Sequence, residues 1–506
     1  MRSNNSGSPN LCEKCIAPFL KLLFPVLALL LSSFGAIPVL SQAQPKNIIF
    51  ILSDDHRYDY MGFHPESPDF LETPSMDRMA DEGVHLSNAF VTTSLCSPSR
   101  ASILTGQYSF RHGAVDNYNP MKEGVRFFPE QLQEEGYETA FMGKWHIGEA
   151  HDDPKPGFDR WISFKGQGVY YDPELNIDGE RVQQEGYITD ILTNYAIDWL
   201  DDGRNKRKPF FLYLSHKAVH SQFHPAERHQ GKYADADLPE PQSGKKIAEN
   251  YEGKPRWVEE QRYSWHGVDH AYHGKKNLEQ IIRNYSESLL AVDESVGKVL
   301  DYLEKEGLAE ETLVIYMGDN GFMFGEHGLI DKRNAYEESM RVPMLAWGPG
   351  YLPEGETMDE VVLNIDVAST FLDLAGAEMP KNHVVDGRSF LPMLEGESLP
   401  DWRDNFIYQY FWEDAFPHTP TTYAIRSAKF KYIYYHGVWD KKELYNLQSD
   451  PGEMHNLIAI PHYRSEAEKM HKMLFDKLSE YGATDVKFRR PGSYRLDERK
   501  IHERSH

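Results

Sequence analysis

The chain has 506 residues, of which 40% are hydrophobic and 13% aromatic, a composition that excludes a disordered or low-complexity protein. It carries 54 lysines and arginines against 78 aspartates and glutamates, a formal net charge of −24. So acidic a chain argues against nucleic acid and anionic membranes as partners, and an anionic substrate would need a locally basic site.

Residues 1–43 have the pattern of a secretory signal peptide. Basic residues precede an apolar run that proline and serine interrupt, and small residues offer cleavage before Gln44. The run is too short and too broken to favour stable membrane insertion. We therefore expect an exported protein, periplasmic or secreted. Cys12 and Cys15 would leave with the signal, so Cys96 would be the only cysteine of the mature chain, which could form no internal disulfide.

Four apolar runs predict buried parallel strands, because they are continuous rather than alternating. They span residues 47–53, 139–142, 210–215 and 312–317. Helical periodicity lies between them at 188–200 and 277–307. Alternating strands and helices predict an α/β fold with a large central, mostly parallel sheet that helices cover on both faces.

Polar side chains follow each of these strands. In chain order they are Asp54, Asp55, His56 and Arg57; Lys144 and His146; His216 and His220; and Asp319 and Asn320. Ligands of such sheets bind beyond the carboxyl ends of the strands, where these groups should meet. A turn or a helix cap explains any one group alone. Four groups at one sheet edge predict an active site.

The residue types limit the chemistry of that site. Its oxygen ligands would come from Asp54, Asp55, Asp319 and Asn320. Oxygen alone suits Ca²⁺ or Mg²⁺ better than zinc, and such a cation could attract an anionic group and neutralise developing charge. Further positive charge would come from Arg100, Lys144, His146, His220 and Lys332.

Cys96 precedes a predicted short helix, 97–105, that has a proline in its first turn. The amino end of a helix favours an anion, and Arg100 would lie on the same face of the helix as Cys96. One chemical interpretation is a Cys-His hydrolase with His146 or His220 as base, although a hard cation has no obvious place in it. A small buried core cysteine is the alternative.

Beyond residue 400 the pattern changes. Residues 423–436 predict an antiparallel hairpin and 464–482 predict a closing helix. We expect a catalytic domain over 44–400, a smaller C-terminal α+β subdomain built on an antiparallel sheet over 401–485, and a polar tail over 486–506.

The segment CSPSRASILTG (96–106) resembles the signature of the type I sulfatases, which belong to the alkaline phosphatase superfamily. The resemblance continues in the family's order through SDDH (53–56), GKWHIG (143–148), GDNG (318–321), DKRNAYEESMRVP (331–343) and ELYNLQSDPGEMHNL (443–457). It covers nearly the whole mature chain and implies an alkaline phosphatase-like fold. It also implies hydrolysis of sulfate esters on a sulfated carbohydrate, either a polysaccharide or an oligosaccharide.

By this resemblance a separate maturation enzyme converts Cys96 to formylglycine (3-oxoalanine). One hydroxyl of the hydrated aldehyde attacks sulfur and the other expels sulfate. The metal ligands of the family match Asp54, Asp55, Asp319 and Asn320, and they hold Ca²⁺ most often, with Mg²⁺ as the alternative. Arg100 would steady the hydrate, and Lys144 and Lys332 would hold sulfate oxygens.

The resemblance also assigns the histidines. His146 would assist the loss of sulfate, and His220 would be the general acid for the leaving alcohol. His216 is its rival, because Val219 stands where the family more often has proline. Contacts with the substrate are predicted for His56, Arg57, Arg111, His112 and His216. Residues 231–276 mix aromatic and basic residues without periodicity and are either a surface loop or a substrate-recognition insertion.

Two other functions remain open at this stage. One is a phosphate or phosphonate ester hydrolase of the same superfamily. The other is a catalytically silent carbohydrate-binding homologue, against which the intact Cys96 and the complete set of metal ligands argue.

Overall fold

The computed structural model describes residues 46–148, 151–272, 274, 277–413, 415–438 and 440–486. The predicted signal peptide (1–43) lies outside the described residues, and so does the predicted tail beyond residue 486. No helix among the described residues is both long and apolar enough to cross a bilayer.

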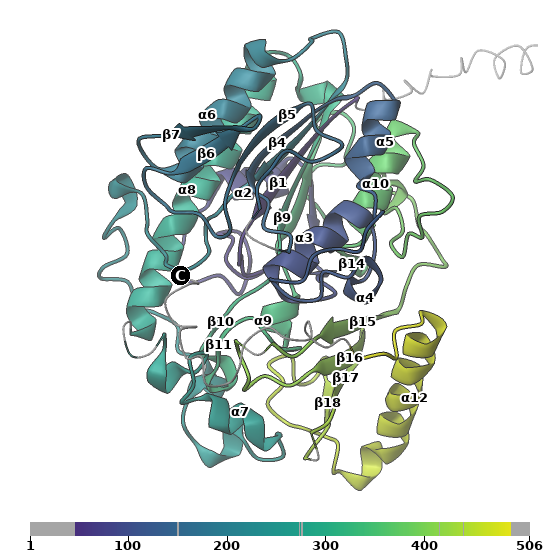
Figure 1. Ribbon diagram of the computed structural model, residues 1–506. Coiled ribbons are helices and arrows are strands. Elements are labelled where there is room, and N and C mark those ends of the chain that lie inside the picture. Colours follow the sequence, from purple (N-terminus) through teal and green to yellow (C-terminus); the bar gives the residue numbers. More distant parts are fainter. Residues whose placement is uncertain are drawn as a thin grey trace, which may run out of the picture. The chain divides into compact units, whose positions relative to one another are not determined.

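A ten-stranded sheet confirms the predicted α/β fold (Figure 1). Its strand order is β13-β2-β12-β9-β1-β8-β4-β5-β6-β7. The adjacent parallel strands are β9 (Thr312–Gly318), β1 (Asn47–Ser53), β8 (Phe210–Ser215), β4 (Glu138–Lys144) and β5 (Arg160–Phe164). The four predicted strands are thus β1, β4, β8 and β9, and their carboxyl ends lie at one edge of the sheet.

Short strands extend the sheet on both sides, and the apolar runs do not predict them. Next to β9 are β12 (Met344–Trp347), which is antiparallel to it, then β2 (Val84–Leu86) and β13 (Glu356–Met358). Next to β5 are the antiparallel strands β6 (Glu174–Ile177) and β7 (Glu180–Gln183). The predicted sheet is therefore correct at its centre and incomplete at its edges.

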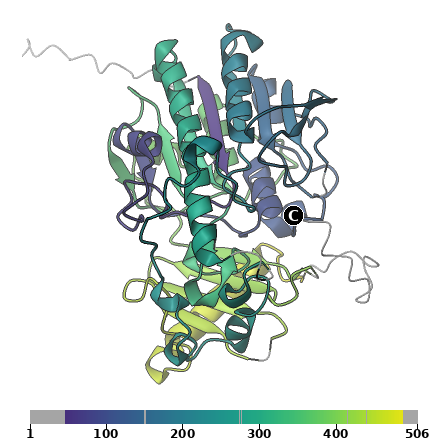
Figure 2. The ribbon, with the colours of Figure 1, turned by 90° about the vertical axis from the view of Figure 1, so that its left-hand side faces the viewer.

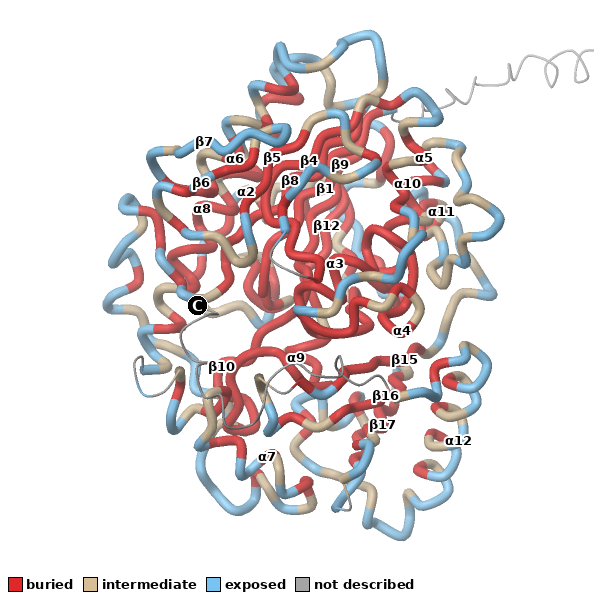
Figure 3. Tube along the Cα trace, in the orientation of Figure 1, coloured by how far each residue is buried: buried red, intermediate tan, exposed pale blue. Residues whose placement is uncertain are grey.

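Helices cover both faces of the sheet, as predicted. One face carries α2 (Pro74–Asp81), α6 (Ile188–Asp198) and α8 (Leu278–Lys305), of which α8 stands in front in Figure 2. The other carries α3 (Cys96–Thr105), α5 (Phe128–Glu134), α10 (Asp366–Ala375) and α11 (Leu391–Leu394). Successive residues of β1 point to opposite faces: Ile49 joins the first core and Phe50 the second. Both faces are buried (Figure 3), which explains the continuous apolar runs.

A separate four-stranded antiparallel sheet confirms the predicted C-terminal α+β part. Its strands are β15 (Asn405–Tyr410), β16 (Thr422–Ser427), β17 (Phe430–Tyr435) and β18 (Glu443–Asn446). The predicted hairpin is β16 and β17, and α12 (Arg464–Glu480) packs against this sheet. The domain boundary at residue 400 stays a prediction.

Short elements connect these parts. They are α4 (Ser109–His112), α7 (Arg256–Gln261), α9 (Glu337–Met340), the pair β3 (Ala89–Phe90) with β14 (Val362–Leu363), and the pair β10 (Met323–Phe324) with β11 (Ile330–Asp331).

A buried ionic network ties α9 to the small sheet. The Glu337 carboxylate accepts hydrogen bonds from Arg426 Nε at 2.9 Å and Lys431 Nζ at 3.0 Å. Lys431 also lies 2.7 Å from a carboxylate oxygen of Glu453. Burial opposes ionisation of Glu337, but the charges of Arg426 and Lys431 outweigh it and hold its pKa well below the ordinary value. Glu337 comes shortly after Lys332 in the chain, so the network anchors the segment that carries Lys332 to the small sheet.

We expect Glu337→Gln to lower the free energy of unfolding by about 3–5 kcal/mol at pH 7, because it leaves two buried cations short of their counter-charge. Since the folded pKa is depressed, this contribution is present above the ordinary value of about 4.3 and is lost as the pH falls below it. Urea unfolding measures both effects. Glu468→Gln is the control, because Glu468 pairs with Arg464 on the exposed face of α12, and it should cost less than about 1 kcal/mol. An equal loss in both variants would contradict the prediction.

Candidate active site

Three carboxylates and one amide meet where β1 and β9 end. The two strands pair in register, Ser53 opposite Gly318, so the residues that follow them are brought together. The Asp55 backbone N–H donates to Asp319 Oδ1 at 3.0 Å, and Asn320 Nδ2 donates to Asp55 Oδ1 at 2.7 Å. Asp54 lies beside them, and all four residues are buried. This is the set from which the sequence predicts a metal site.

The set fits a hard cation. Asn320 Oδ1 is buried and accepts no hydrogen bond within the described part of the chain, which leaves an oxygen free for a metal ion. Burial, reinforced by the charges of Asp54 and Asp319, raises the pKa of Asp55 to about 7. Burial also opposes ionisation of Asp54, but the surrounding positive charges, Lys144 first among them, together outweigh it and hold the pKa of Asp54 well below its usual range. A bound divalent cation would favour the ionised form of all three carboxylates.

Cys96 is the first residue of α3 and points at this cluster. Its Sγ lies 3.4 Å from Asp54 Oδ1 and 3.2 Å from Lys332 Nζ. One ligand atom from each of Asp54, Asp55, Cys96 and His220 lies within 4.8 Å of the others. Burial, and then the charge of Asp54, raises the pKa of the Cys96 thiol to about 12. A protonated thiol is a poor nucleophile, so the geometry does not favour a Cys-His hydrolase.

Three cations surround the carboxylates. Arg100 is on α3, and its Nε donates to Asp319 Oδ2 at 2.8 Å while its Nη1 donates to the Lys144 carbonyl at 2.7 Å. Lys144, the last residue of β4, contacts Asp54 and Gln167 through its Nζ. Lys332 contacts Asp55. The three cations equal the three carboxylates in number, and a bound divalent cation would make the site locally basic, as an anionic substrate requires.

Two predicted histidines flank the cluster. His220 Nδ1 lies 2.7 Å from the Ser221 carbonyl oxygen, and because a carbonyl oxygen can only accept, Nδ1 donates the hydrogen bond. Nδ1 therefore carries the proton, and Nε2 faces the site, 3.8 Å from Asp55 Oδ2. His146 has a buried Nδ1 with no hydrogen-bond partner among the described residues, and its Nε2 lies 3.5 Å from Gln167 Nε2.

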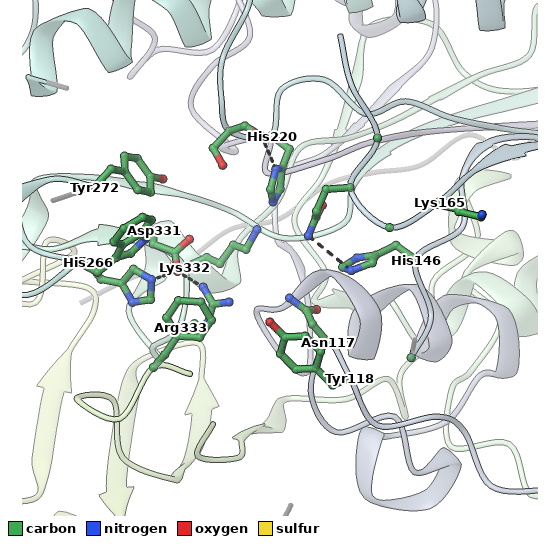
Figure 4. A pocket seen from close by; sticks show the side chains of 17 residues that line it. Asn117, Tyr118, His146, Lys165, His220, His266, Tyr272, Asp331, Lys332 and Arg333 are labelled. Atoms are coloured by element: carbon green, nitrogen blue, oxygen red, sulfur yellow. Dashed lines mark hydrogen bonds and ion pairs between the residues drawn. The ribbon is translucent and has the colours of Figure 1, made fainter. Parts of the chain in front are cut away.

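A cavity of about 400 Å³ opens beside these groups (Figure 4). His146, His220 and Lys332 line it and point toward its centre. The segment 231–276 contributes Trp265, His266 and Tyr272 to the wall. This supports the interpretation of that segment as a substrate-recognition insertion.

One end of the cavity is built from residues that sequence analysis does not single out. Arg333 contacts Asp331, donates to Glu413 Oε1 at 2.9 Å, and lies 3.7 Å from the ring centre of Phe416. His266 Nε2 lies 3.4 Å from Asp331 Oδ2. The sequence does contain a signal for two of these residues, because Asp331 and Arg333 lie directly before and after Lys332. Phe416 follows β15 in a loop and carries no sequence signal.

Five residues predicted to contact substrate are not brought to this cavity, because each has partners elsewhere in the fold. The partners are Tyr316 and Tyr60 for His56, Asp59 and Glu326 for Arg57, Asp386 for Arg111, Ser102 for His112, and Ser295 for His216. None of the five is among the residues that line the cavity. His216 therefore gains no support as the rival of His220.

Comparisons with known proteins show the family of this chain. The family model for sulfatases matches residues 46–377, and the model "N-sulphoglucosamine sulphohydrolase, C-terminal" matches residues 325–480. The N-acetylglucosamine-6-O-sulfatase of Bacteroides thetaiotaomicron is 34% identical over 92% of this chain and 91% of its own length. The human N-acetylglucosamine-6-sulfatase is 29% identical over 97% of this chain and 94% of its own length.

Solved structures share the fold. A protein in complex with its substrate, D-glucosamine-2-N,6-O-disulfate, aligns with a TM-score of 0.80 and 33% identity over 88% of this chain and 99% of that chain. The phosphonate monoester hydrolase of Agrobacterium radiobacter aligns with a TM-score of 0.71 over 86% and 96% of the two chains, but at 21% identity this shows the fold alone. Matches over nine tenths of both chains, together with the family model, establish that this chain belongs to the sulfatase family of sulfuric ester hydrolases.

Proposed function

We propose that this chain hydrolyses the sulfate ester of a sulfated carbohydrate, and that its substrate is the 6-O-sulfate of a glucosamine unit. The observation that carries the proposal is the position of Cys96, with Asp54 on one side and the cavity-lining Lys332 on the other. The sugar is inferred from relatives named N-acetylglucosamine-6-sulfatases and from the glucosamine disulfate bound by the structural neighbour.

Two groups would complete the site. Oxidised by a maturation enzyme to formylglycine, position 96 would supply a geminal diol, with one hydroxyl for attack on sulfur and one for the release of sulfate. Asp54, Asp55, Asp319 and Asn320 would hold a divalent cation, Ca²⁺ or Mg²⁺, that neutralises charge on the sulfate group.

The chain's own cations would bind and orient the sulfate. Lys332 Nζ is placed 3.2 Å from the sulfur atom of Cys96 and so reaches whatever group reacts there. Lys144 lies on the opposite side, at Asp54. Arg100 is fixed by Asp319 and by the Lys144 carbonyl, and it would hold the hydroxyls of position 96. These contacts are made before substrate arrives, so little reorganisation is needed in the transition state.

His220 and His146 would move protons. The Ser221 carbonyl fixes the ring of His220 and leaves its Nε2 facing the site. Burial and the charge of Lys144 lower the pKa of His220, but the negative charge of a bound sulfate ester would raise it again, so that Nε2 could carry a proton and donate it to the departing sugar oxygen. His146, beside Lys144, would assist the loss of sulfate. We also propose that the chain is exported to the periplasm or beyond, on the basis of residues 1–43 alone.

Sulfate release from N-acetylglucosamine-6-sulfate tests the proposed function. The protein is made together with a formylglycine-generating enzyme, and N-acetylgalactosamine-6-sulfate and a sugar 6-phosphate serve as comparison substrates. Faster release from the glucosamine ester supports the proposal. Preference for the galactosamine ester would move the substrate to another sugar, and preference for the phosphate ester would overturn sulfate as the group removed.

We expect His220→Ala to lower kcat on a sugar sulfate by about 10²-fold or more, because the alkoxide leaves without a proton. The loss on nitrophenyl sulfate should be much smaller, since a nitrophenolate leaves without protonation. His216→Ala is the matched control: its ring bonds Ser295 within the core, so any loss should be equal on both substrates. Steady-state kinetics on the two esters measure both losses. If His216→Ala instead lost more activity on the sugar sulfate than on nitrophenyl sulfate, His216 would be the general acid.

A further inference from the structure

A second cavity, of about 300 Å³, adjoins the first. The two share Gln167, Gly168, His220 and Ser221 as lining residues. The rest of its wall comes from residues 169–171 and from the segment that follows β8, including Lys217. Because His220 lines both cavities, a group bound in the second one would belong to the same substrate molecule or lie directly beside it.

This second cavity is basic in an acidic protein. Its lining holds one lysine and two histidines, Lys217, His220 and His224, and no aspartate or glutamate. The chain as a whole has a net charge of −24, whereas this lining contributes no negative charge. A cavity with this lining attracts anions rather than cations.

Lys217 is the main cation of this wall, and it lacks a counter-ion. The residue is only 3% exposed and forms no ion pair within 4.0 Å with a carboxylate of the described chain, although the charges of Asp54 and Asp55 act on it from farther away. Nζ has a long contact with the Ser221 carbonyl at 3.4 Å and lies 4.6 Å from the ring centre of Tyr170. An ammonium group offers three donors, so donor capacity remains.

A buried, unpaired ammonium is unfavourable, and an anion in contact with it removes the penalty. Burial, with the charge of Lys144 next in importance, lowers the pKa of Lys217 to about 7, and an anion in the cavity would raise it again. The wall beyond Lys217 is aromatic, from Tyr170 and Tyr171, and could pack against a sugar ring.

We propose that this cavity is an anion subsite, in which Lys217 binds a second sulfate or carboxylate group of the substrate, away from the ester that is cleaved. The inference rests on the proposed function, because it places both anions on one sulfated sugar or oligosaccharide. It makes this chain selective for multiply charged substrates. The substrate of the structural neighbour, which carries two sulfates, shows that such molecules are available to the family.

The test compares kcat/KM for three substrates in wild type and Lys217→Met. N-acetylglucosamine-6-sulfate carries one anion, glucosamine-2-N,6-O-disulfate carries a second on the same ring, and a 6-sulfated disaccharide with a uronate carries it on the next sugar. We expect wild type to prefer one of the doubly charged substrates by about 10-fold or more, the worth of one charge-assisted contact, and Lys217→Met to lose that preference. Loss of the preference for the disulfate would identify the bound group as the sulfamate, and loss of the preference for the disaccharide would identify it as the carboxylate.

Lys165→Met is the matched control, because Lys165 is an exposed lysine on the wall of the first cavity only. It should keep the ratio of the wild type. Loss of the ratio in Lys165→Met instead would assign the anion to the first cavity and overturn the inference. An equal fall on all three substrates in Lys217→Met would show a supporting role only, and would also overturn it. Lys217→Gln is tested as a second variant in case Lys217→Met does not fold, and the melting temperatures of both show whether they are folded.

The two proposals fail in different ways. If wild type releases sulfate from none of the three substrates, the proposed function fails. If it releases sulfate from N-acetylglucosamine-6-sulfate and the ratios in wild type and Lys217→Met agree, the anion subsite alone fails. Calorimetric binding of glucosamine-2-N-sulfate to wild type and Lys217→Met needs no turnover, and equal affinities would contradict the subsite independently.

Discussion

Cys96→Ala should abolish sulfate ester hydrolysis, with a fall in kcat of about 10⁴-fold or more, while the protein stays folded. Among the described residues, the Cys96 side chain has polar contacts only with Asp54 and Lys332, so truncation to alanine leaves only a small cavity. Cys96→Ser should be equally inactive. A serine hydroxyl could attack sulfur, but it cannot expel sulfate by re-forming an aldehyde.

The same argument applies to wild type made without a maturation enzyme. Its thiol has a pKa of about 12, is protonated at neutral pH and offers no second hydroxyl. Activity should therefore follow the converted fraction, which mass spectrometry of the 96–106 peptide measures as replacement of the thiol by an aldehyde. Ser102→Ala is the control in the same helix, where Ser102 bonds His112 away from the cavity, and it should keep activity within a few-fold. Full activity in unconverted protein would contradict the proposed role of position 96.

The centre of the site could be predicted from the sequence because it depends on strand ends. Lys144, Asp54 and Asp319 each come just after a continuous apolar run. Buried parallel strands have their carboxyl ends at one edge, so those three residues had to come together. The register of β1 with β9 then decides the detail, with Ser53 opposite Gly318.

The cavity wall could not be predicted in the same way. Trp265 and Phe416 lie in segments without periodicity, and only the folded chain shows that both face the cavity. Lys217 precedes His220 in one turn, and nothing in the sequence shows that its side chain lies in a cavity free of carboxylates.

Nearness along the chain to a signature residue was also misleading. His56 follows Asp55, whose φ of 58° turns the backbone, and its ring points back to Tyr316 on the neighbouring strand β9. Position in a motif thus predicts that a residue is near the site, but not which way its side chain points.

If Asp54, Asp55, Asp319 and Asn320 hold the proposed divalent cation, its removal should lower kcat by about 10³-fold and also destabilise the fold. Asp54, Asp55 and Asp319 are buried carboxylates in one cluster, and without a cation their mutual repulsion is opposed only by Arg100, Lys144 and Lys332 among the described residues. A cation bound at 100 to 1,000 times its dissociation constant adds about 2.7–4.1 kcal/mol to the free energy of unfolding. Chelation should therefore lower the melting temperature by several degrees, and adding back Ca²⁺ or Mg²⁺ should identify the ion that restores both properties.

The variant Asn320→Ala tests cation binding while it leaves the three carboxylates in place. It deletes a buried ligand oxygen that accepts no hydrogen bond from the described residues, together with the Nδ2 bonds to Asp55 and the Gly321 carbonyl. We expect the variant to be folded, to bind the cation at least about 10-fold more weakly, and to show a smaller shift in melting temperature when the cation is added. Asp386→Asn is the control, since it removes a buried carboxylate that pairs with Arg111 instead, and its metal content by elemental analysis should match wild type. If neither the chelator nor the added cation changes the melting temperature or the activity of wild type, these oxygens hold no metal ion, and the proposed cation site is wrong.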